Sequence, residues 1–310
     1  MRKRAILPPR RRHLSGSALL LVLWAVAVLS ITVLAVARVV RSDVDDASLQ
    51  NRRFEARELA LTGVALGMHP KIEPWDSLLD QKLGGGRELR VRVISEASRM
   101  DINRALKEPD QKTLRKLFEI WGAKQEVISA AVDSLVDWTD ADDLRSLNGA
   151  EKSDLLKQTV YSLPANRDFR SVNEMERVRG MDAIAALNPD WADYFTVNGG
   201  RRIDLQDASI DLMRAGGLSE EQARMVEQVR NGADKLPQTK DDYKIKNMTE
   251  FLRRIGVSDD QMQLIQSKFG AGLGPTRINS RARIGGTDYR IVVVAARGAQ
   301  DNGLIVWDEQ

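Results

Sequence analysis

One long apolar run dominates the hydrophobic pattern of the chain and lies close to its N-terminus. No charged residue occurs from Leu14 to Ala37, and residues 18–37 are almost wholly apolar. At about 1.5 Å per residue, a helix of this length crosses the roughly 30 Å hydrocarbon core of a bilayer. No second apolar run of this length follows in the sequence. The pattern predicts a single membrane-spanning or signal-bearing segment.

An amphipathic stretch continues the apolar run without a break. From Arg38 to about Leu66 there is no proline, and the first glycine is Gly63. Apolar residues recur among many charges with a loose helical period, which predicts one helix over residues 17–67, roughly 75 Å long. We expect His69-Pro70 to end it. A helix that is half apolar and half amphipathic is typical of the spine of pilin-like proteins, whereas a merely anchored protein usually has a linker after its span.

Three interpretations of the N-terminus remain open. A secretory signal peptide would be cut after Ala35-Val36-Ala37, but its apolar region would exceed the usual length of about 7–15 residues. A plain anchor would remain uncut. The order of a basic leader, Gly16 and an apolar helix resembles the class III, or prepilin, signal, in which the cut follows the glycine and the helix is retained. The unbroken helical continuation favours this third interpretation.

The residue at the fifth position after this cut bears on where the subunit would sit in a filament. In pilin-like proteins a glutamate at this position is thought to pair with the N-terminal amine of a neighbouring subunit, because a carboxylate buried in lipid or protein needs a partner. With Ser17 as the first mature residue, the fifth residue here is Leu21. A subunit with no subunit ahead of it needs no such carboxylate. Leu21 therefore indicates a filament tip and not its shaft.

Strand-like sequence occurs near residue 90 and again after residue 276. Residues 88–95 alternate apolar and charged positions, residues 277–284 and 289–297 flank Gly285-Gly286 as a predicted hairpin, and a last strand is expected from Gly303 to Trp307. The intervening pattern is helical. The sequence therefore predicts an α+β fold, in which a pilin-like spine helix and a small antiparallel sheet carry a large inserted all-α domain. The expected domains are a leader (1–16), the spine (17–67), an α/β domain (68–100 and 276–310) and the insertion (101–275).

The predicted insertion contains a weak repeat. Three segments run apolar-x-x-x-x-Gly-apolar, and each is followed by a residue expected to cap the next helix. The pairs of glycine and cap are Gly180 with Asp182, Gly217 with Ser219, and Gly256 with Ser258. Such units resemble SAM-like and helix-hairpin-helix bundles, so an exported helix-hairpin-helix protein that binds or takes up DNA is the alternative function. That motif needs a second glycine whose backbone N–H faces phosphate, and the cap residues stand in its place.

Composition and charge narrow the chemistry further. The 310 residues include 47 Lys and Arg against 44 Asp and Glu, a net charge of +3, but six cations lie in the first 16 residues with no acid. The rest of the chain therefore carries −3, which disfavours nucleic acid as a partner. With no cysteine and only His13 and His69, thiolate metal sites and histidine-based triads are disfavoured. The common nucleotide-binding and hydrolase motifs are also absent, so we expect no enzyme and assign no catalytic residue.

The densest cluster of candidate metal ligands lies at 137–143, in the segment DWTDADD, with Glu151 shortly after it. Four carboxylates within seven residues suit Ca²⁺, a hard cation that prefers several oxygen ligands. The match to an EF-hand loop is poor, however, because its glycine and its last acid are missing. A helix end with solvated acids is the alternative, and Trp138 between the acids is expected to pack in a core.

Several segments together resemble the minor pseudopilin K of type II secretion, also called general secretion pathway protein K. The N-terminal segment GSALLLVLWAVAVLS contains Gly16, Trp24 of the spine helix and no glutamate at the fifth mature position. The others are MDINRAL (100–106), DWTDADD with the following GAE (137–151), SLPANRDFRSVNEMERVRGM (162–181) and RIDLQDAS (201–209). The resemblance covers essentially the whole chain.

The resemblance implies a structural role in protein export. Family members are single-pass inner-membrane prepilins with most of the chain in the periplasm, and the prepilin peptidase cleaves and N-methylates them. The mature protein caps a short pseudopilus together with minor pseudopilins I and J and is thought to start its assembly. Known members bind calcium, which the resemblance carries over to Asp140, Asp142 and Glu151. Two departures are the absence of the tyrosines that many members have after GAE, and Ser17 in place of the phenylalanine common in major pilins.

Overall fold

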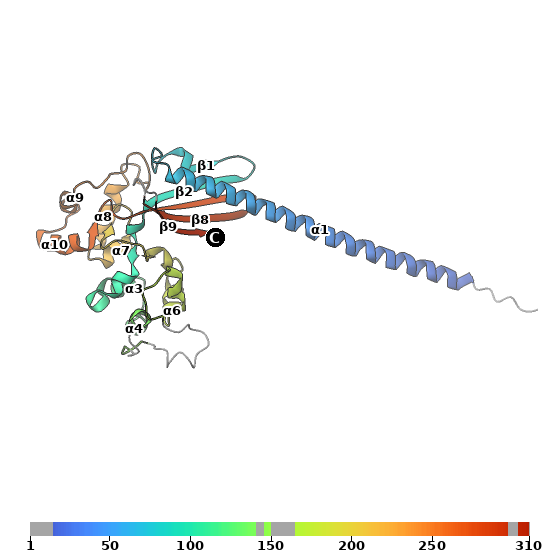
Figure 1. The fold of residues 1–310 in the computed structure, drawn as a ribbon, viewed down its shortest axis with the longest axis horizontal. Coiled ribbons are helices and arrows are strands. Elements are labelled where there is room, and N and C mark those ends of the chain that lie inside the picture. The colour runs from blue at the N-terminus through green and yellow to red at the C-terminus, as the bar shows by residue number, and fades with distance from the viewer. Residues whose placement is uncertain (1–14, 141–145, 150–164, 297–302, 310) are drawn as a thin grey trace, which may run out of the picture. The chain divides into compact units, whose positions relative to one another are not determined.

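The N-terminal part of the structure is one long helix. The computed structural model describes residues 15–140, 146–149, 165–296 and 303–309 (Figure 1). Helix α1 begins at Ser15 and ends at Met68, as the sequence predicts, and the His69-Pro70 step follows it directly. Contacts divide the chain at Glu55 and Ala56 into two units, which are described separately below.

The second unit contains a five-stranded antiparallel sheet in the order β1-β2-β7-β8-β9. Its strands are β1 (Asp80–Lys82), β2 (Arg87–Ser95), β7 (Thr276–Ile284), β8 (Thr287–Ala295) and β9 (Leu304–Glu309). The predicted strand near residue 90, the hairpin and the last strand are confirmed. Strand β1 was not predicted, because its three residues, Asp-Gln-Lys, show no apolar alternation.

A two-residue turn fixes the register of the central hairpin. Gly285 and Gly286, with φ of 52° and 87°, join β7 to β8, and Ile284 lies opposite Thr287. Positive φ at both turn residues matches the right-handed twist of the strands and favours glycine there. The turn thereby places Ile278 and Val293 opposite each other on the apolar face of the sheet.

The end of α1 packs on this apolar face. Ala56, Ala60 and Val64 are buried, and the last two share a core with Val91 and Ile291 of the sheet. The approach is closest at Gly63, where an added Cβ would lie 2.2 Å from Ser280 Oγ and 2.8 Å from atoms of Leu89 and Val91. The buried hydroxyl of Ser280 donates a hydrogen bond to the carbonyl of Ala60 at 2.8 Å. Small residues on the helix therefore let its backbone approach the strands.

A second connection joins α1 to the edge strand β9. The Arg57 guanidinium donates to both carboxylate oxygens of Glu309, at 2.8 and 2.9 Å, and Tyr289 Oη and Trp307 Nε1 donate to the same carboxylate. These donors, Arg57 foremost, lower the pKa of Glu309 to about 2. The clamp joins residues 252 positions apart in the sequence.

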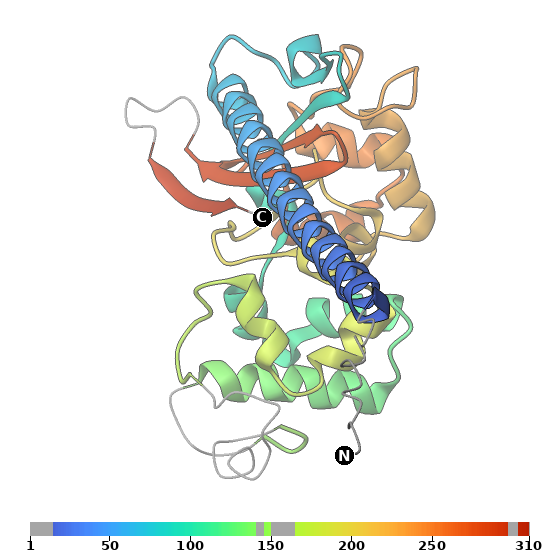
Figure 2. The same ribbon diagram turned by 90° about the vertical axis from the view of Figure 1, so that its right-hand side faces the viewer.

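The insertion lies between β2 and β7 and is mainly helical. Its helices fall into two groups, α3 with α4 and α6, and α8 with α9 and α10, and α7 contacts both α3 and α8 (Figures 1 and 2). The helices are α2 (Ile102–Leu106), α3 (Lys112–Ile120), α4 (Gln125–Thr139), α6 (Met181–Leu187), α7 (Ile210–Ala215), α8 (Glu220–Arg230), α9 (Met248–Arg254) and α10 (Asp259–Lys268). One core, which includes the buried rings of Phe118, Phe195, Phe251 and Phe269, runs through the insertion.

Two short parallel strand pairs bring distant parts of the insertion together. Strand β3 (Met100–Asp101) pairs with β4 (Phe195–Thr196), and β5 (Ile203–Asp204) pairs with β6 (Phe269–Gly270). We expected no strands here. That expectation was wrong because each strand has only two residues, too few for an alternating pattern.

The predicted repeat is visible in the backbone. Gly180, Gly217 and Gly256 all have positive φ, of 89°, 112° and 83°. Ser219 caps α8, with its hydroxyl accepting from the N–H of Gln222 and the Gln222 side chain accepting from the N–H of Ser219. Ser258 precedes α10 as predicted, although its side chain accepts no capping hydrogen bond.

The prediction that Asp182 caps a helix was wrong. Helix α6 begins at Met181, with Gly180 as its cap residue, so Asp182 lies inside the first turn. Gly180 packs against the backbone of Ala131 in α4, where an added Cβ would lie 3.1 Å from its Cα. This contact brings α6 close to α4, and a carboxylate in the first turn remains favourable there.

These elements together are the α+β fold predicted from the sequence, with a long N-terminal helix, an antiparallel sheet and an inserted helical region. The predicted domain boundaries stay a prediction, because the contacts divide the chain only at residue 55.

Substitution of Gly63 tests the close approach of α1 to the sheet. We expect Gly63→Val to lower the free energy of unfolding by about 1–3 kcal/mol, because the added atoms overlap Ser280 and the two β2 side chains. Urea denaturation of the full chain in detergent measures the change. Ala65→Leu, on an exposed position of the same helix, is the matched control and should change stability far less. Equal effects of the two substitutions would contradict the packing described here.

Candidate functional site

The described part of the first unit is the apolar and amphipathic part of α1, and its side chains from Leu19 onward are mostly exposed. The helix is long and apolar enough to cross a membrane from Leu19 onward, and its most apolar 18-residue window has a mean hydropathy of 2.8 with none of the window buried. Leu21 and Trp24 are 71% and 70% exposed. An apolar surface of this extent is stable only in lipid or against other protein. The predicted span therefore fits a single membrane anchor.

Polar side chains within the span bond to their own helix. Ser30 Oγ donates to the carbonyl of Val26, and Thr32 Oγ1 donates to the carbonyl of Val28, each at 2.8 Å. Within a bilayer these hydroxyls find no water, so the internal hydrogen bonds offset the cost of burying them. Both residues are thus compatible with the hydrocarbon core.

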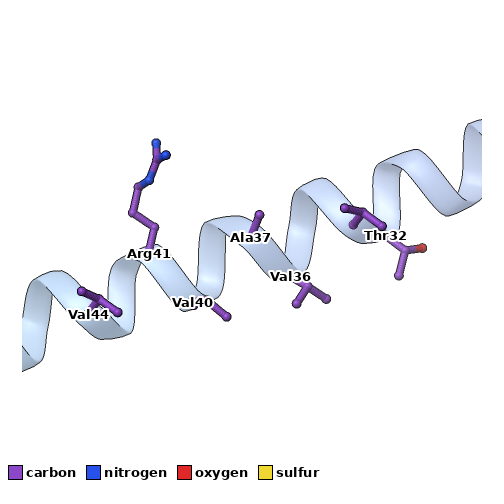
Figure 3. A pocket seen from close by; sticks show the side chains of 7 residues that line it. Thr32, Val36, Ala37, Val40, Arg41 and Val44 are labelled. Atoms are coloured by element: carbon purple, nitrogen blue, oxygen red, sulfur yellow. The ribbon is translucent and has the colours of Figure 1, made fainter.

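An apolar stripe runs from the span into the amphipathic part of the helix. Val36, Val40 and Val44 are spaced four residues apart, and each is more than half exposed. In Figure 3, Val36 and Val40 point to the side of the helix opposite Arg41. We name Val36, Val40 and Val44 the valine stripe. Its spacing is that of one helix packing against another.

The predicted cleavage site lies at the start of α1. Gly16 and Ser17 belong to the first turn of the helix, and the basic leader lies outside the described residues. Cleavage between them stays a prediction.

The acidic segment is organised by two carboxylates on α4. Asp137 is fully buried and accepts hydrogen bonds from the N–H of Ser146 at 3.1 and 3.2 Å. Asp133 accepts from the N–H and the side chain of Asn148 and forms an ion pair with Arg115 at 2.7 Å. Gly149 lies so close to Asp137 that a Cβ would meet its carboxylate. These acids therefore hold the chain at 146–149 against α4.

The candidate calcium ligands are only partly described. Asp140 follows the end of α4 and is partly buried, whereas Asp142 and Glu151 lie outside the described residues. Within the described parts of the chain, no group of three or more His, Asp or Glu side chains is arranged to hold a metal ion. The calcium site therefore stays a prediction.

Three of the segments that carry the family resemblance meet at Phe169. Trp138 is buried, as predicted, and stacks on Phe169 at 6.0 Å with an interplanar angle of 3°. The Asn103 side chain donates to the carbonyl of Phe169 and accepts from its N–H, at 2.9 and 2.8 Å. Asn103 belongs to one of the characteristic segments of the sequence, but its residue type and position do not predict this role. The pairing of an Asx amide with one distant backbone residue has no local sequence signal.

The polar face of the sheet meets the insertion through buried charges. Glu96, at the end of β2, is buried, accepts from Thr196 Oγ1 at 2.5 Å and pairs with Arg277 at 3.2 Å. Nearby, the N–H of Ser95 donates to Asp207 at 2.9 Å. Burial, together with the charges of Asp204 and Asp242, raises the pKa of Asp207 to about 6, although Ser95 and Arg230 oppose the shift.

This combination defines a class of protein, in which a pilin-like spine helix and antiparallel sheet carry an inserted helical region. Residues 92–189 match the family model described as type II secretion system (T2SS), protein K, and this range includes the three segments that meet at Phe169. The sequence is 30% identical over 200 residues to type II secretion system protein K of Pseudomonas aeruginosa strain PAO1, covering 56% of this chain. The family model and the Pseudomonas relative both carry the description protein K of the type II secretion system, in agreement with the resemblance of the sequence segments.

The fold has a counterpart among solved structures. A chain in the crystal structure of the GspK-GspI-GspJ complex from the type 2 secretion system of enterotoxigenic Escherichia coli aligns with a TM-score of 0.59 at 15% identity. The alignment covers 87% of this chain and 98% of that chain, so nearly the whole fold is shared. The sequence alignment with the Pseudomonas protein spans 60% of the length of that relative.

Asp207 makes the stability of the contact between the sheet and the insertion depend on pH. Because its pKa of about 6 exceeds the ordinary value of 3.8, the folded state binds this proton more tightly than the unfolded chain does. The stabilisation of the folded state by this proton is complete below about pH 4 and is lost as the pH rises through about 6. We expect Asp207→Asn to raise the free energy of unfolding at pH 7 by about 1–3 kcal/mol and to have little effect at pH 4. Urea denaturation at both pH values measures this difference.

The matched control for this experiment is Gln228→Ala, on an exposed position of the insertion that carries no titratable group. The control should change stability equally at the two pH values. A loss of stability at pH 7 in Asp207→Asn would mean that its charged form stabilises the junction, contrary to the argument above.

Proposed function

We propose that the chain is a minor pseudopilin of a type II secretion system, located at the tip of the pseudopilus, where it helps to start assembly and supports protein export across the outer membrane. The observation that carries the proposal is the protein K family match in the insertion of a chain that also has a pilin-like spine. The role is structural, and no residue is assigned to catalysis.

The charge pattern of the N-terminus supports a location in the inner membrane with the bulk of the chain in the periplasm. Six cations precede the apolar run and none follows until Arg38, a distribution that keeps the leader in the cytoplasm. The prepilin peptidase then cuts after Gly16 and methylates the new amine of Ser17. The apolar part of α1 exchanges lipid for contact with neighbouring spines when the subunit leaves the membrane.

Two features support a position at the tip. Leu21 stands where a shaft subunit needs a carboxylate for the subunit ahead of it. The insertion adds about 180 residues between two neighbouring strands of the sheet, a bulk that stacking subunits in a shaft would have to accommodate. A tip position relieves both constraints.

Minor pseudopilins I and J are the proposed partners. The solved relative assembles with GspI and GspJ, as the name of its complex states. The valine stripe offers an apolar helix face for the spine of such a partner. The alternative of a helix-hairpin-helix DNA-binding protein finds no support, since the matched family is one of protein secretion and the second glycines of that motif are replaced by Asp182, Ser219 and Ser258.

Processing by the prepilin peptidase is tested by a substitution at the cut. We expect Gly16→Val to leave the leader attached and the protein unassembled, because a β-branched residue blocks access to the scissile bond. N-terminal sequencing of protein from cells with and without the peptidase measures this. The wild type should begin at Ser17 only when the peptidase is present, and Ser15→Ala should be processed normally. A wild-type chain that begins at Arg38 in both strains would disprove the proposal.

The partner-binding face of the spine is tested with two substitutions in the valine stripe. We expect Val40→Asn with Val44→Asn to weaken binding to pseudopilins I and J by at least about tenfold, because both apolar contacts are lost while residues 18–37 are unchanged. Co-purification from membranes measures the complex. Ser42→Asn, an exposed position two residues from each of the two valines and so on the other side of the helix, is the matched control. Equal weakening by the control would place the interface elsewhere.

A further inference from the structure

A hollow of about 440 Å³ lies between the polar face of the sheet and the insertion. Strands β8 and β9 contribute the apolar side chains of Val292, Val294 and Val306, and the insertion contributes Phe195 and Thr196. Arg99 and Arg277 line the same hollow. It is distinct from the membrane helix, the valine stripe and the acidic segment.

The two arginines are unusually buried for charged residues. The side chain of Arg99 is 10% exposed and that of Arg277 is 15% exposed. The Nε atom of each is buried and has no hydrogen-bond partner among the described residues. Burial, together with the nearby charge of Arg277, lowers the pKa of Arg99. Buried donors without acceptors are costly, and two adjacent guanidinium groups repel each other.

The acidic side chains around the hollow do not neutralise the charges of the two buried arginines. Glu96, with a side chain 3% exposed, is the acid buried beside them, and its two oxygens already accept from Thr196 and Arg277. Asp193 pairs with Arg99 at 3.1 Å, but its side chain is 55% exposed, so water screens that pair. Asp190 and Asp308 lie nearer the rim, as do Arg170 and Arg290. Among the residues that the structure describes, the buried end therefore carries two cations for one carboxylate.

We propose that this hollow binds a carboxylate group carried between apolar neighbours, as in a peptide segment with an acidic side chain. Guanidinium groups present a planar fork of donors that matches the two oxygens of a carboxylate. An anion at the buried end relieves the repulsion between Arg99 and Arg277 and supplies the second negative charge. The valines fit the apolar flanks of such a segment. The inference does not depend on the role in secretion.

The test uses two blocked tripeptides and the full chain in detergent. Acetyl-Val-Glu-Val-amide carries one side-chain carboxylate, and acetyl-Val-Gln-Val-amide is its neutral match. We expect the Glu peptide to raise the Tm of the wild type with saturation and the Gln peptide to have no such effect. Sodium acetate at the same ionic strength distinguishes a free carboxylate from a carboxylate in a peptide. A rise in Tm equal to that with the Glu peptide assigns the site to free carboxylates, and a smaller rise assigns it to peptides.

Variants of the arginines identify the site. We expect Arg99→Met to weaken the apparent binding of the Glu peptide by about tenfold or more, and Arg290→Gln, at the rim, to weaken it by a smaller factor if the first variant does not fold. Arg281→Met, on an exposed position of β7 outside the hollow, is the control and should respond like the wild type. The proposal is overturned if neither carboxylate raises the Tm with saturation, if the Gln peptide acts equally, or if the arginine variants at the hollow respond like the control.

Discussion

The close approach of α1 to the sheet at Ala60 and Gly63 is the constraint on which the rest of the structure depends. A residue with a larger side chain at Gly63 would push the helix away from β2 and β7, and the hydrogen bond from Ser280 to the Ala60 carbonyl would be lost. Because β2 and β7 are also the two strands between which the insertion leaves and returns, this one contact joins the membrane helix, the sheet and the helical region. The clamp at Glu309 then ties the outermost strand to the same helix.

The two faces of the sheet are packed through different kinds of interaction. The face toward α1 is apolar and is stabilised by burial of small and branched side chains, an interaction that tolerates little change in shape. The face toward the insertion carries Glu96 and Arg277 together with valines, and its contacts are directional hydrogen bonds and ion pairs. Polar contacts of this kind set the orientation of a packed region more than they add stability. The face toward α1 therefore stabilises the packing of the helix on the sheet, and the face toward the insertion sets the orientation of the insertion.

Much of the fold could be predicted because its signals are local. The apolar run, the absence of helix breakers up to Gly63, the alternation near Val91 and the Gly285-Gly286 turn each carry their own physical cause. What escaped prediction depends on tertiary contacts. Strands of two residues have no period, and the start of α6 at Met181 depends on the packing of Gly180 against α4. The role of Asn103 and the buried pair of arginines could not be predicted from the sequence, because in both cases residues from separate segments come together only in the fold.

The clamp between Arg57 and Glu309 also constrains the order in which the protein can fold. The end of α1, which contains Arg57, is synthesised directly after the apolar run. Strand β9 follows the insertion, and its Glu309 comes 252 residues after Arg57. Strands β2 and β7 are likewise neighbours in space but far apart along the chain. Contacts of such long sequence separation form late and slowly. The helical insertion can therefore collapse on its own local contacts during synthesis, while the sheet stays open, with exposed edges, until its last strands have been made.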